Sequence, residues 1–459
     1  MGRIFSVFFA AALSIASLRA QTPDAVILFE PPQKLFPAIS ETMRKIYPDP
    51  RSEMLLALTL SPVGYPNFNG VSNDQNMGIC VFDTGEVVTA AIYASKESAI
   101  SRFSEGMSEK PAKIGDWLIM PLFTPRQGFD ISGYAEATAE AMRARHSANL
   151  ASAQADAAFI LAAIEKYAGY KVSSNLAQDI ESARITLDID GPDFVATLRI
   201  VAKDGTLLKT AFNKFSWRTE EKEARFIPQD AAFTFLSSVY LGGKNTPLTM
   251  EMADRYFGDR YSQKYAKLLE KFEGSFAMTE GDKGGGAVSV SVSSTKITMD
   301  ELLEYVAELY KSSGSEDKIE FCEIGGTKAV ANSAAEGAAR MYWAVADGYM
   351  VNSDNPETLA RTVEKVRAES GSDAPYKLQR YAKLNADFVL IMNNNTLLNS
   401  VLKSFGMGYT DENFGSDFTI EGKIGMGRMD LAMRADMATI RAYADIFRKL
   451  REAVQDGKN

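Results

Sequence analysis

The chain contains a single histidine, His146, and this limits the catalysis and metal binding that the sequence can support. A Ser-His-acid set needs one well-placed histidine, and a multi-histidine metal site needs several. His146 lies in a segment rich in Ala, Arg and Met that is typical of a helix, so a surface position is expected. Asp188, Asp190 and Asp193 cluster at a predicted turn, but they are too few and wrongly ordered for a calcium loop. We therefore predict no metal site and no cofactor.

Three short motifs could still carry serine chemistry. Ser293-Ser294-Thr295-Lys296, Ser353-Asp354-Asn355 and Lys423-Ile424-Gly425 follow the order of the motifs of penicillin-binding serine enzymes, in which a lysine deprotonates the nucleophile. The fit is poor because the serine should open a buried helix, whereas Ser293 ends an alternating, strand-like segment. Ile424 also replaces a required hydroxyl-bearing residue. A serine hydrolase is thus a distant alternative, and no catalytic residue is predicted.

Apolar side chains give the remaining signal for binding. Met429, Leu431 and Met433 share one face of a predicted strand, and Met426 lies nearby. Adaptable methionine side chains suit a pocket for a lipid or a peptide. The alternative is a sheet face packed under the last helix. We keep Met426, Met429 and Met433 as possible ligand contacts.

A loop between residues 64 and 70 offers two aromatic rings, Tyr65 and Phe68, between chain-breaking glycines. Exposed rings of this kind suit a recognition tip. The alternative is that both rings pack into a local core. We keep both residues as possible partner contacts.

The elements that would position these side chains repeat along the chain. An acidic residue beside alanine opens four apolar, strand-like runs, at residues 24–29, 156–161, 230–235 and 386–391, and a helical pattern follows each. Asp156 and Asp387 lie 231 positions apart, and Ile189 and Ile424 lie 235 apart. The segment at Trp117 also resembles that at Tyr349. These offsets predict a duplicated domain.

We therefore predict an α+β fold of two tandem, similar domains, each an antiparallel sheet meander covered on one face by helices. The predicted bounds are 21–226 and 227–459, since the charged run 220–223 precedes Ile227-Pro228-Gln229 and a new strand. The first predicted meander covers residues 184–212, and its third strand is predicted from Leu207 to Phe212, after a turn at 203–206. Asn355 and Pro356 predict the start of a helix.

This layout resembles exported bacterial proteins of unknown function that are built from duplicated strand, helix and hairpin units. The resemblance rests on the acidic-alanine strand openings and covers most of the chain after its first twenty residues. It implies a fold and an extracytoplasmic address, and it carries over no catalytic residue.

The first twenty residues predict the same address. Arg3 precedes an apolar stretch from Ile4 to Ala16, and Ala20 closes the segment with a small residue, as in a signal peptide. We predict cleavage near Ala20 and a soluble periplasmic or secreted protein with no later membrane span. Cys80 and Cys322 are predicted either to form one bridge or to be two buried thiols.

The chain has 459 residues and a net charge of −9, which becomes −11 when the leader with its two arginines is removed. This charge disfavours a general binder of nucleic acids or anionic membranes. The sequence therefore predicts a non-catalytic extracytoplasmic binding or structural protein. The alternative is a carrier of a small hydrophobic ligand, and the partner is unknown.

Overall fold

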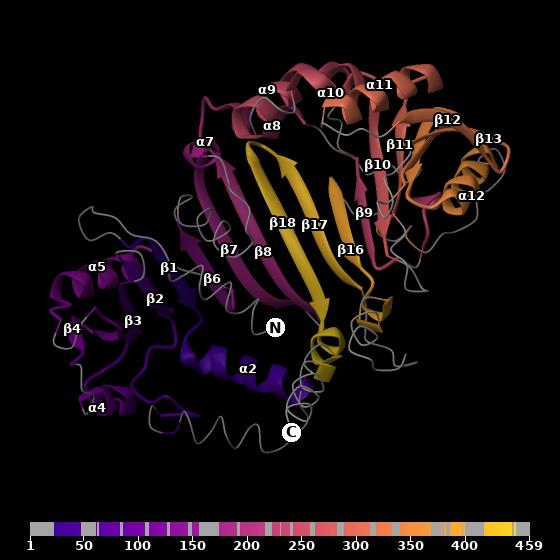
Figure 1. The fold of residues 1–459 in the computed structure, drawn as a ribbon. Coiled ribbons are helices and arrows are strands. Elements are labelled where there is room, and N and C mark those ends of the chain that lie inside the picture. Colours follow the sequence, from indigo (N-terminus) through magenta and orange to yellow (C-terminus); the bar gives the residue numbers. More distant parts are fainter. Residues whose placement is uncertain are drawn as a thin grey trace, which may run out of the picture. The chain divides into compact units, whose positions relative to one another are not determined.

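The computed structural model describes two compact units of the chain (Figure 1). The first unit comprises Met1–Ala202 and Arg434–Asn459, and the second comprises Lys203–Met433. The structure describes residues 23–46, 61, 64–82, 86–105, 110–125, 129–145, 149–155, 174–190, 193–215, 223–229, 231–238, 242–257, 262–281, 289–312, 318–332, 340–368, 378, 381, 386–396, 398–399, 417–442 and 445–446.

The first unit contains an antiparallel sheet with helices between its strands. Hydrogen-bonded neighbours give the strand order β4, β5, β3, β2, β1, β6, β7, β8. The bounds are β1 (Ala25–Phe29), β2 (Met77–Phe82), β3 (Val87–Tyr93), β4 (Ala112–Ile114), β5 (Trp117–Phe123), β6 (Ala151–Ala155), β7 (Ile180–Asp190) and β8 (Asp193–Ala202). The helices are α2 (Pro32–Ile46), α4 (Ala99–Glu105), α5 (Ser132–Arg143) and α7 (Ser174–Asp179).

The second unit contains a similar antiparallel sheet. Its strand order is β12, β13, β14, β15, β11, β10, β9, β16, β17. The bounds are β9 (Phe233–Ser237), β10 (Phe272–Glu280), β11 (Ser289–Thr295), β12 (Ile319–Ile324), β13 (Thr327–Asn332), β14 (Tyr342–Ala346), β15 (Tyr349–Ser353), β16 (Phe388–Met392) and β17 (Phe418–Gly425). The helices are α8 (Leu207–Lys214), α9 (Thr246–Phe257), α10 (Ser262–Leu269), α11 (Met299–Ser312) and α12 (Pro356–Arg367), with 3-10 turns η3 (Glu223–Arg225) and η4 (Gly243–Asn245).

Strand pairing in the second unit repeats that in the first. β9 pairs with β10 and β16 as β1 pairs with β2 and β6, and β15 pairs with β11 and β14 as β5 pairs with β3 and β4. Trp117 and Tyr349 begin equivalent strands, and Ile189 and Ile424 lie on the equivalent strands β7 and β17. Asp156 lies outside the described residues. The second sheet adds the β12–β13 hairpin.

The compact units do not follow the predicted domain bounds. Helix α8 comes directly after the last strand of the first repeat, yet it belongs to the second unit. Conversely, the boundary at Arg434 falls within β18 (Arg428–Asp436), the last strand of the second repeat, and assigns residues 434–459 to the first unit. The bounds 21–226 and 227–459 stay a prediction about tandem domains.

Each sheet buries one face under the helix that follows its hairpin of short strands. In the first unit α5 packs Ala135, Ala139 and Met142 onto strands β2, β3 and β5. In the second unit α12 packs Leu359 and Val363 onto the hairpin of β14 and β15. The predicted α+β fold with antiparallel sheets is confirmed.

The predicted strand from Leu207 to Phe212 is wrong, because these residues form helix α8. The hydroxyl of Thr206 caps the helix by accepting a hydrogen bond from the Lys209 amide at 3.2 Å. Leu208, Ala211 and Phe212 are buried, so the apolar spacing is that of a helix face. The polar turn at 203–206 is therefore a helix start.

The helix start predicted at Asn355 is confirmed. The Asn355 side chain accepts a hydrogen bond from the Thr358 amide at 2.9 Å, and Pro356 occupies the first turn. Among the described residues, no helix is long and apolar enough to cross a membrane.

Candidate functional site

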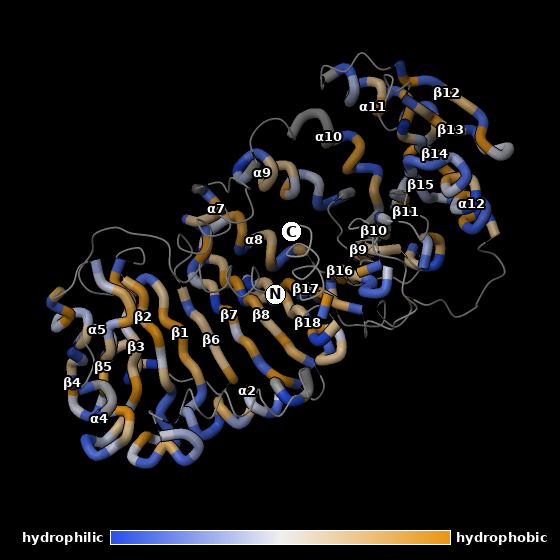
Figure 2. Tube along the Cα trace, turned by 60° about the horizontal axis from the view of Figure 1, so that its bottom comes forward, coloured by the Kyte–Doolittle hydropathy of each residue, from blue (hydrophilic) through white to orange (hydrophobic). Residues whose placement is uncertain are grey.

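The first sheet has an apolar face that helices leave partly exposed. Cross-strand pairs join Ile27 to Ile79 and Ile185 to Leu198, and paired side chains share a face. We call this surface the first open face; its partly exposed members are Ile27, Ile79, Ile185, Leu187, Ile189, Phe194, Leu198 and Ile200. Figure 2 shows the hydrophobic colour that runs along β1, β2 and β3.

The opposite side of strands β6 to β8 is polar. It presents Gln154, Arg184 and Arg199, all exposed, which lie opposite one another in a row across the three strands. A sheet with one wet face normally directs its apolar residues to a covered core. The partial exposure of the apolar side is therefore the unusual feature of this unit.

The second sheet has an equivalent surface, the second open face, which is rich in phenylalanine. The Phe235 ring lies 6.3 Å from that of Phe276 and 6.0 Å from that of Phe388, measured between centroids. Its partly exposed members are Phe233, Phe235, Phe276, Met278, Phe388, Leu390, Met392, Phe418 and Ile420. Helix α11 covers the far end of the same face, where Trp343 packs with Leu302 and Val306.

Gly422 shapes the second open face. A Cβ atom at this position would lie 2.1 Å from the Phe388 ring, so only glycine allows the ring to rest on the β17 backbone. The ring stays in place between β17 and Phe235. The face is thus a close-fitted aromatic surface with part of its area open.

Tyr65 and Phe68 do not form an exposed tip. Phe68 is only 2% exposed and stacks on Phe36 of α2, with 5.2 Å between ring centroids, while Tyr65 meets Phe68 edge-on at 5.8 Å. Gln33 fixes the loop by donating to the carbonyl oxygen of Val71 at 3.0 Å. The two rings belong to a cluster that also contains Leu118 and Ile92, and this cluster covers one end of the first open face.

The methionines divide into two groups. Met426 is 88% exposed in a two-residue turn in which both Met426 and Gly427 have positive φ. A turn of this kind places Gly425 opposite Arg428, and hence Ile420 and Met433 on the same face. Met429 and Met433 are partly exposed and extend the second open face, whereas Met426 lies beyond it.

The serine motifs do not have the geometry that their chemistry needs. Ser293 lies inside β11, where it pairs with Phe276 and Met350, and not at the start of a helix. The Ser353 hydroxyl accepts a hydrogen bond from the Asn355 amide at 3.1 Å. Lys423 is exposed on β17.

Both cysteines are free thiols. Burial raises the pKa of Cys80 to about 12, against a smaller opposing effect of its hydrogen bond with Thr138. Burial also raises the pKa of Cys322. Because the thiolate is the nucleophilic form, these environments disfavour cysteine chemistry at neutral pH.

Asp188 and Asp190, two members of the acidic cluster noted in the sequence, bind separate partners. Asp188 accepts a hydrogen bond from the Asn149 amide group at 3.0 Å, and Asp190 forms an ion pair with Arg434 at 3.4 Å. Within the described part of the chain, no group of three or more His, Cys, Asp or Glu could hold a metal ion. His146 lies outside the described residues.

Asp387 is the buried acid at the start of the second open face. Its carboxylate accepts a hydrogen bond from the Ile424 amide, and its own amide donates to the Gly422 carbonyl at 2.7 Å. Burial raises the pKa of this carboxyl above its ordinary value, and the Ile424 amide and Lys423 oppose the shift. Asp387 therefore joins β16 to β17 by hydrogen bonds, while burial destabilises its charged carboxylate.

Replacement of Asp387 by asparagine is expected to remove a pH dependence of stability. With a raised pKa, the folded state keeps the proton longer than the unfolded chain, so the free energy of unfolding falls as the pH rises through the raised pKa. Asp387→Asn keeps an oxygen acceptor for the Ile424 amide and has no proton to lose. Urea unfolding at pH 4 and pH 7 should show a smaller decline for the variant. An equal decline in Asp387→Asn and in Asp347→Asn, which changes an exposed turn, would contradict the assignment.

The phenylalanines of the second open face were not among the predicted contacts. The sequence predicts strands at 230–235 and 386–391 and assigns no ligand contact to either, although residues 388–392 are apolar at every position. A run that is apolar at every position indicates a strand with apolar side chains on both faces of the sheet, and both faces then need cover. Here α12 and its neighbours cover one face, and the other keeps partly exposed rings.

Fold and site together define an α+β protein with a duplicated antiparallel sheet and one partly exposed apolar face in each unit. The sequence matches no family model and no curated protein. Solved structures of TP0453 match half of the chain at low similarity. Crystal form IV has a TM-score of 0.28 and 5% identity over 49% of this chain and 96% of TP0453, and crystal form III has 0.27 and 8% over 49% and 97%.

Proposed function

We propose that this protein is a non-catalytic extracytoplasmic binding protein and that it carries a small hydrophobic ligand, such as a lipid, on its open faces. The observation that supports this most is the pair of partly exposed apolar faces. Burial of apolar area stabilises a complex without any catalytic group, at roughly 25 cal/mol per Å². A concave or sheet-lined apolar surface with few polar groups is a common form of ligand site.

The second open face is the better candidate for the principal site. Its rings offer large apolar area with little side-chain entropy to lose, because Phe235 already contacts both Phe276 and Phe388. Met429 and Met433 extend the surface with adaptable side chains. The first open face is aliphatic, so we expect it to bind the same probes more weakly.

Phe235→Thr is expected to weaken binding of Nile red by on the order of 10- to 100-fold, because it removes the central ring of the cluster at a cost of about 1.5–3 kcal/mol of apolar contact. Threonine keeps a good strand former in β9. Fluorescence titration of the purified full-length protein measures the affinity.

Phe321→Thr provides the matched control. Phe321 is 38% exposed on β12, on the same side of this sheet, but four strands (β13, β14, β15 and β11) separate it from β10. Its loss should therefore leave the titration unchanged. Solvent extraction followed by mass spectrometry should also release a stoichiometric lipid from the exported protein. Equal affinities for the two variants, with no extracted lipid, would contradict a carrier and favour a protein partner.

The extracytoplasmic address rests on the leader at residues 1–20. We expect the exported protein to begin near Gln21, since a positive residue, a short apolar stretch and a small residue form the pattern that signal peptidase recognises. N-terminal sequencing of the exported chain measures this. An intact Met1 in the purified protein would refute it.

A further inference from the structure

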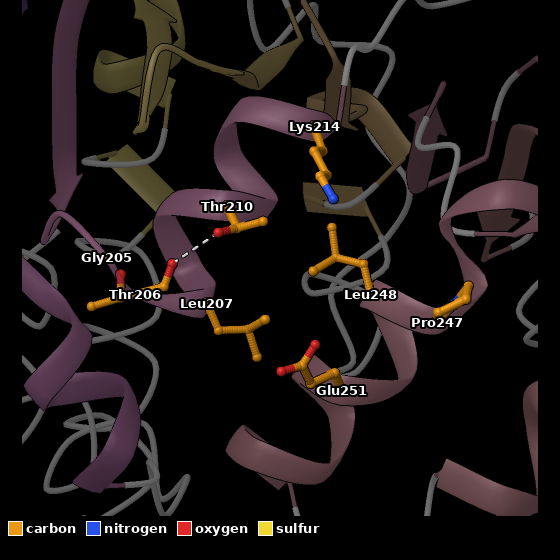
Figure 3. Close-up of a pocket in the computed structure, with 8 residues that line it drawn as sticks. All are labelled: Gly205, Thr206, Leu207, Thr210, Lys214, Pro247, Leu248 and Glu251. Atoms are coloured by element: carbon orange, nitrogen blue, oxygen red, sulfur yellow. Dashed lines mark hydrogen bonds between the residues drawn. The ribbon is translucent and has the colours of Figure 1, made fainter.

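A pocket of about 390 Å³ lies between helices α8 and α9 of the second unit. None of its lining residues belongs to the second open face. Figure 3 shows its walls, which α8 and the start of α9 supply. The two helices pack directly on each other, so the walls are held together. The lining residues are Gly205, Thr206, Leu207, Thr210, Lys214, Pro247, Leu248 and Glu251.

The pocket has one positive and one negative group, on opposite walls. Lys214 ends α8 and Glu251 lies on α9, and both are exposed (Figure 3). Among the described residues neither forms an ion pair, whereas Lys209 of the same helix is paired with Asp204 at 3.2 Å. The ammonium and carboxylate groups are therefore available to a ligand.

The two threonine hydroxyl groups of the pocket are already bonded, in α8 and in the turn that precedes it. The Thr206 hydroxyl donates to the Lys203 carbonyl at 2.7 Å, and the Thr210 hydroxyl donates to the Thr206 carbonyl at 3.2 Å. Leu207, Leu248 and Pro247 add the apolar part of a lining whose exposed area is mostly polar. Recognition thus depends on two opposite charges and an apolar contact.

This arrangement discriminates by charge. A simple anion attracted to Lys214 would also meet the carboxylate of Glu251, and a simple cation would meet the ammonium of Lys214. A molecule with both charges satisfies both walls. We propose that the α8–α9 pocket binds a small zwitterion with an apolar side chain, of the class of the free aliphatic amino acids.

Calorimetric titration of the full-length protein with leucine tests this. Leucine is expected to bind with a Kd of about 1 mM or tighter. 4-Methylpentanoate, which lacks the ammonium group, isoamylamine, which lacks the carboxylate, and N-acetylleucinamide, which lacks both charges, should each bind on the order of fivefold more weakly.

The variants should change which ligand is preferred. Lys214→Met is expected to weaken leucine binding and to favour isoamylamine over 4-methylpentanoate, and Glu251→Gln should reverse that preference. Lys244→Met and Asp254→Asn are charge-matched controls, because both residues are exposed near the pocket without lining it. Nile red titration separates this site from the open face, since none of these variants should alter it.

Three results would overturn the proposal. These are no heat with leucine, equal affinity for leucine and N-acetylleucinamide, or the same losses in the control variants as in Lys214→Met and Glu251→Gln. Each result leaves the proposed hydrophobic ligand of the open face untouched.

Discussion

Removal of residues 434–459 is expected to lower the free energy of unfolding of the first unit by about 3–6 kcal/mol, from the loss of two large buried side chains at about 1.5–3 kcal/mol each. These residues belong to the first unit although they end the second repeat. Met437 is 7% exposed and Ile446 is 4% exposed. The Asp190–Arg434 ion pair would also be lost. Hydrogen exchange monitored by mass spectrometry measures the change for each unit.

The second unit provides an internal control for this truncation. Amides of β6 and β7 should lose protection, while those of β9, β10 and β16 should keep it, because the latter strands pair only within the second unit. Equal loss in both units would show that the division into units is wrong. No loss in either would show that residues 434–459 do not stabilise the first unit.

Leu359→Ala is expected to lower the free energy of unfolding of the second unit by about 3 kcal/mol, because it leaves a cavity under α12. Leu359 is fully buried in the cluster that contains Val351, Ala344 and Val363. Equilibrium urea unfolding of the second unit measures the decrease in its free energy of unfolding.

Arg361→Ala is the matched control on the same helix. Its exposed pair with Glu357, at 3.3 Å, is worth at most about 0.5 kcal/mol. A loss below about 1 kcal/mol for Leu359→Ala would mean that the core closes around the missing side chain, and that α12 does not hold this face as described.

Much of the fold could be predicted from local pattern. The likeness of the segments at Trp117 and Tyr349 and the start of α12 at Asn355 depend on short-range turn and capping chemistry, which a single sequence displays. Helix α8 was missed because six residues, Leu207 to Phe212, carry too little periodicity to separate strand from helix. The capping role of Thr206 is the signal that could have decided it.

The candidate site could be predicted only in part. Met429 and Met433 were found because alternation along one strand is visible in sequence, and they extend the second open face. Phe235, Phe276 and Phe388 come from three strands that neighbour each other only after β9 has paired with β10 and β16. Tyr65 and Phe68 were equally consistent with a tip and with a core, and only the presence of Phe36 and Gln33 decides between them.

Each compact unit includes a segment that lies next to the other repeat in the sequence, and this sets an order of folding during synthesis. Helix α8 is made before every strand of the unit that it joins, whereas the first unit needs residues that follow Asp190 by 244 positions, as the pair with Arg434 shows. Contacts of such high sequence separation form slowly, since a long loop must close first. The first unit therefore stays unfinished on the ribosome until nearly the whole chain has emerged, although its strands are translated first.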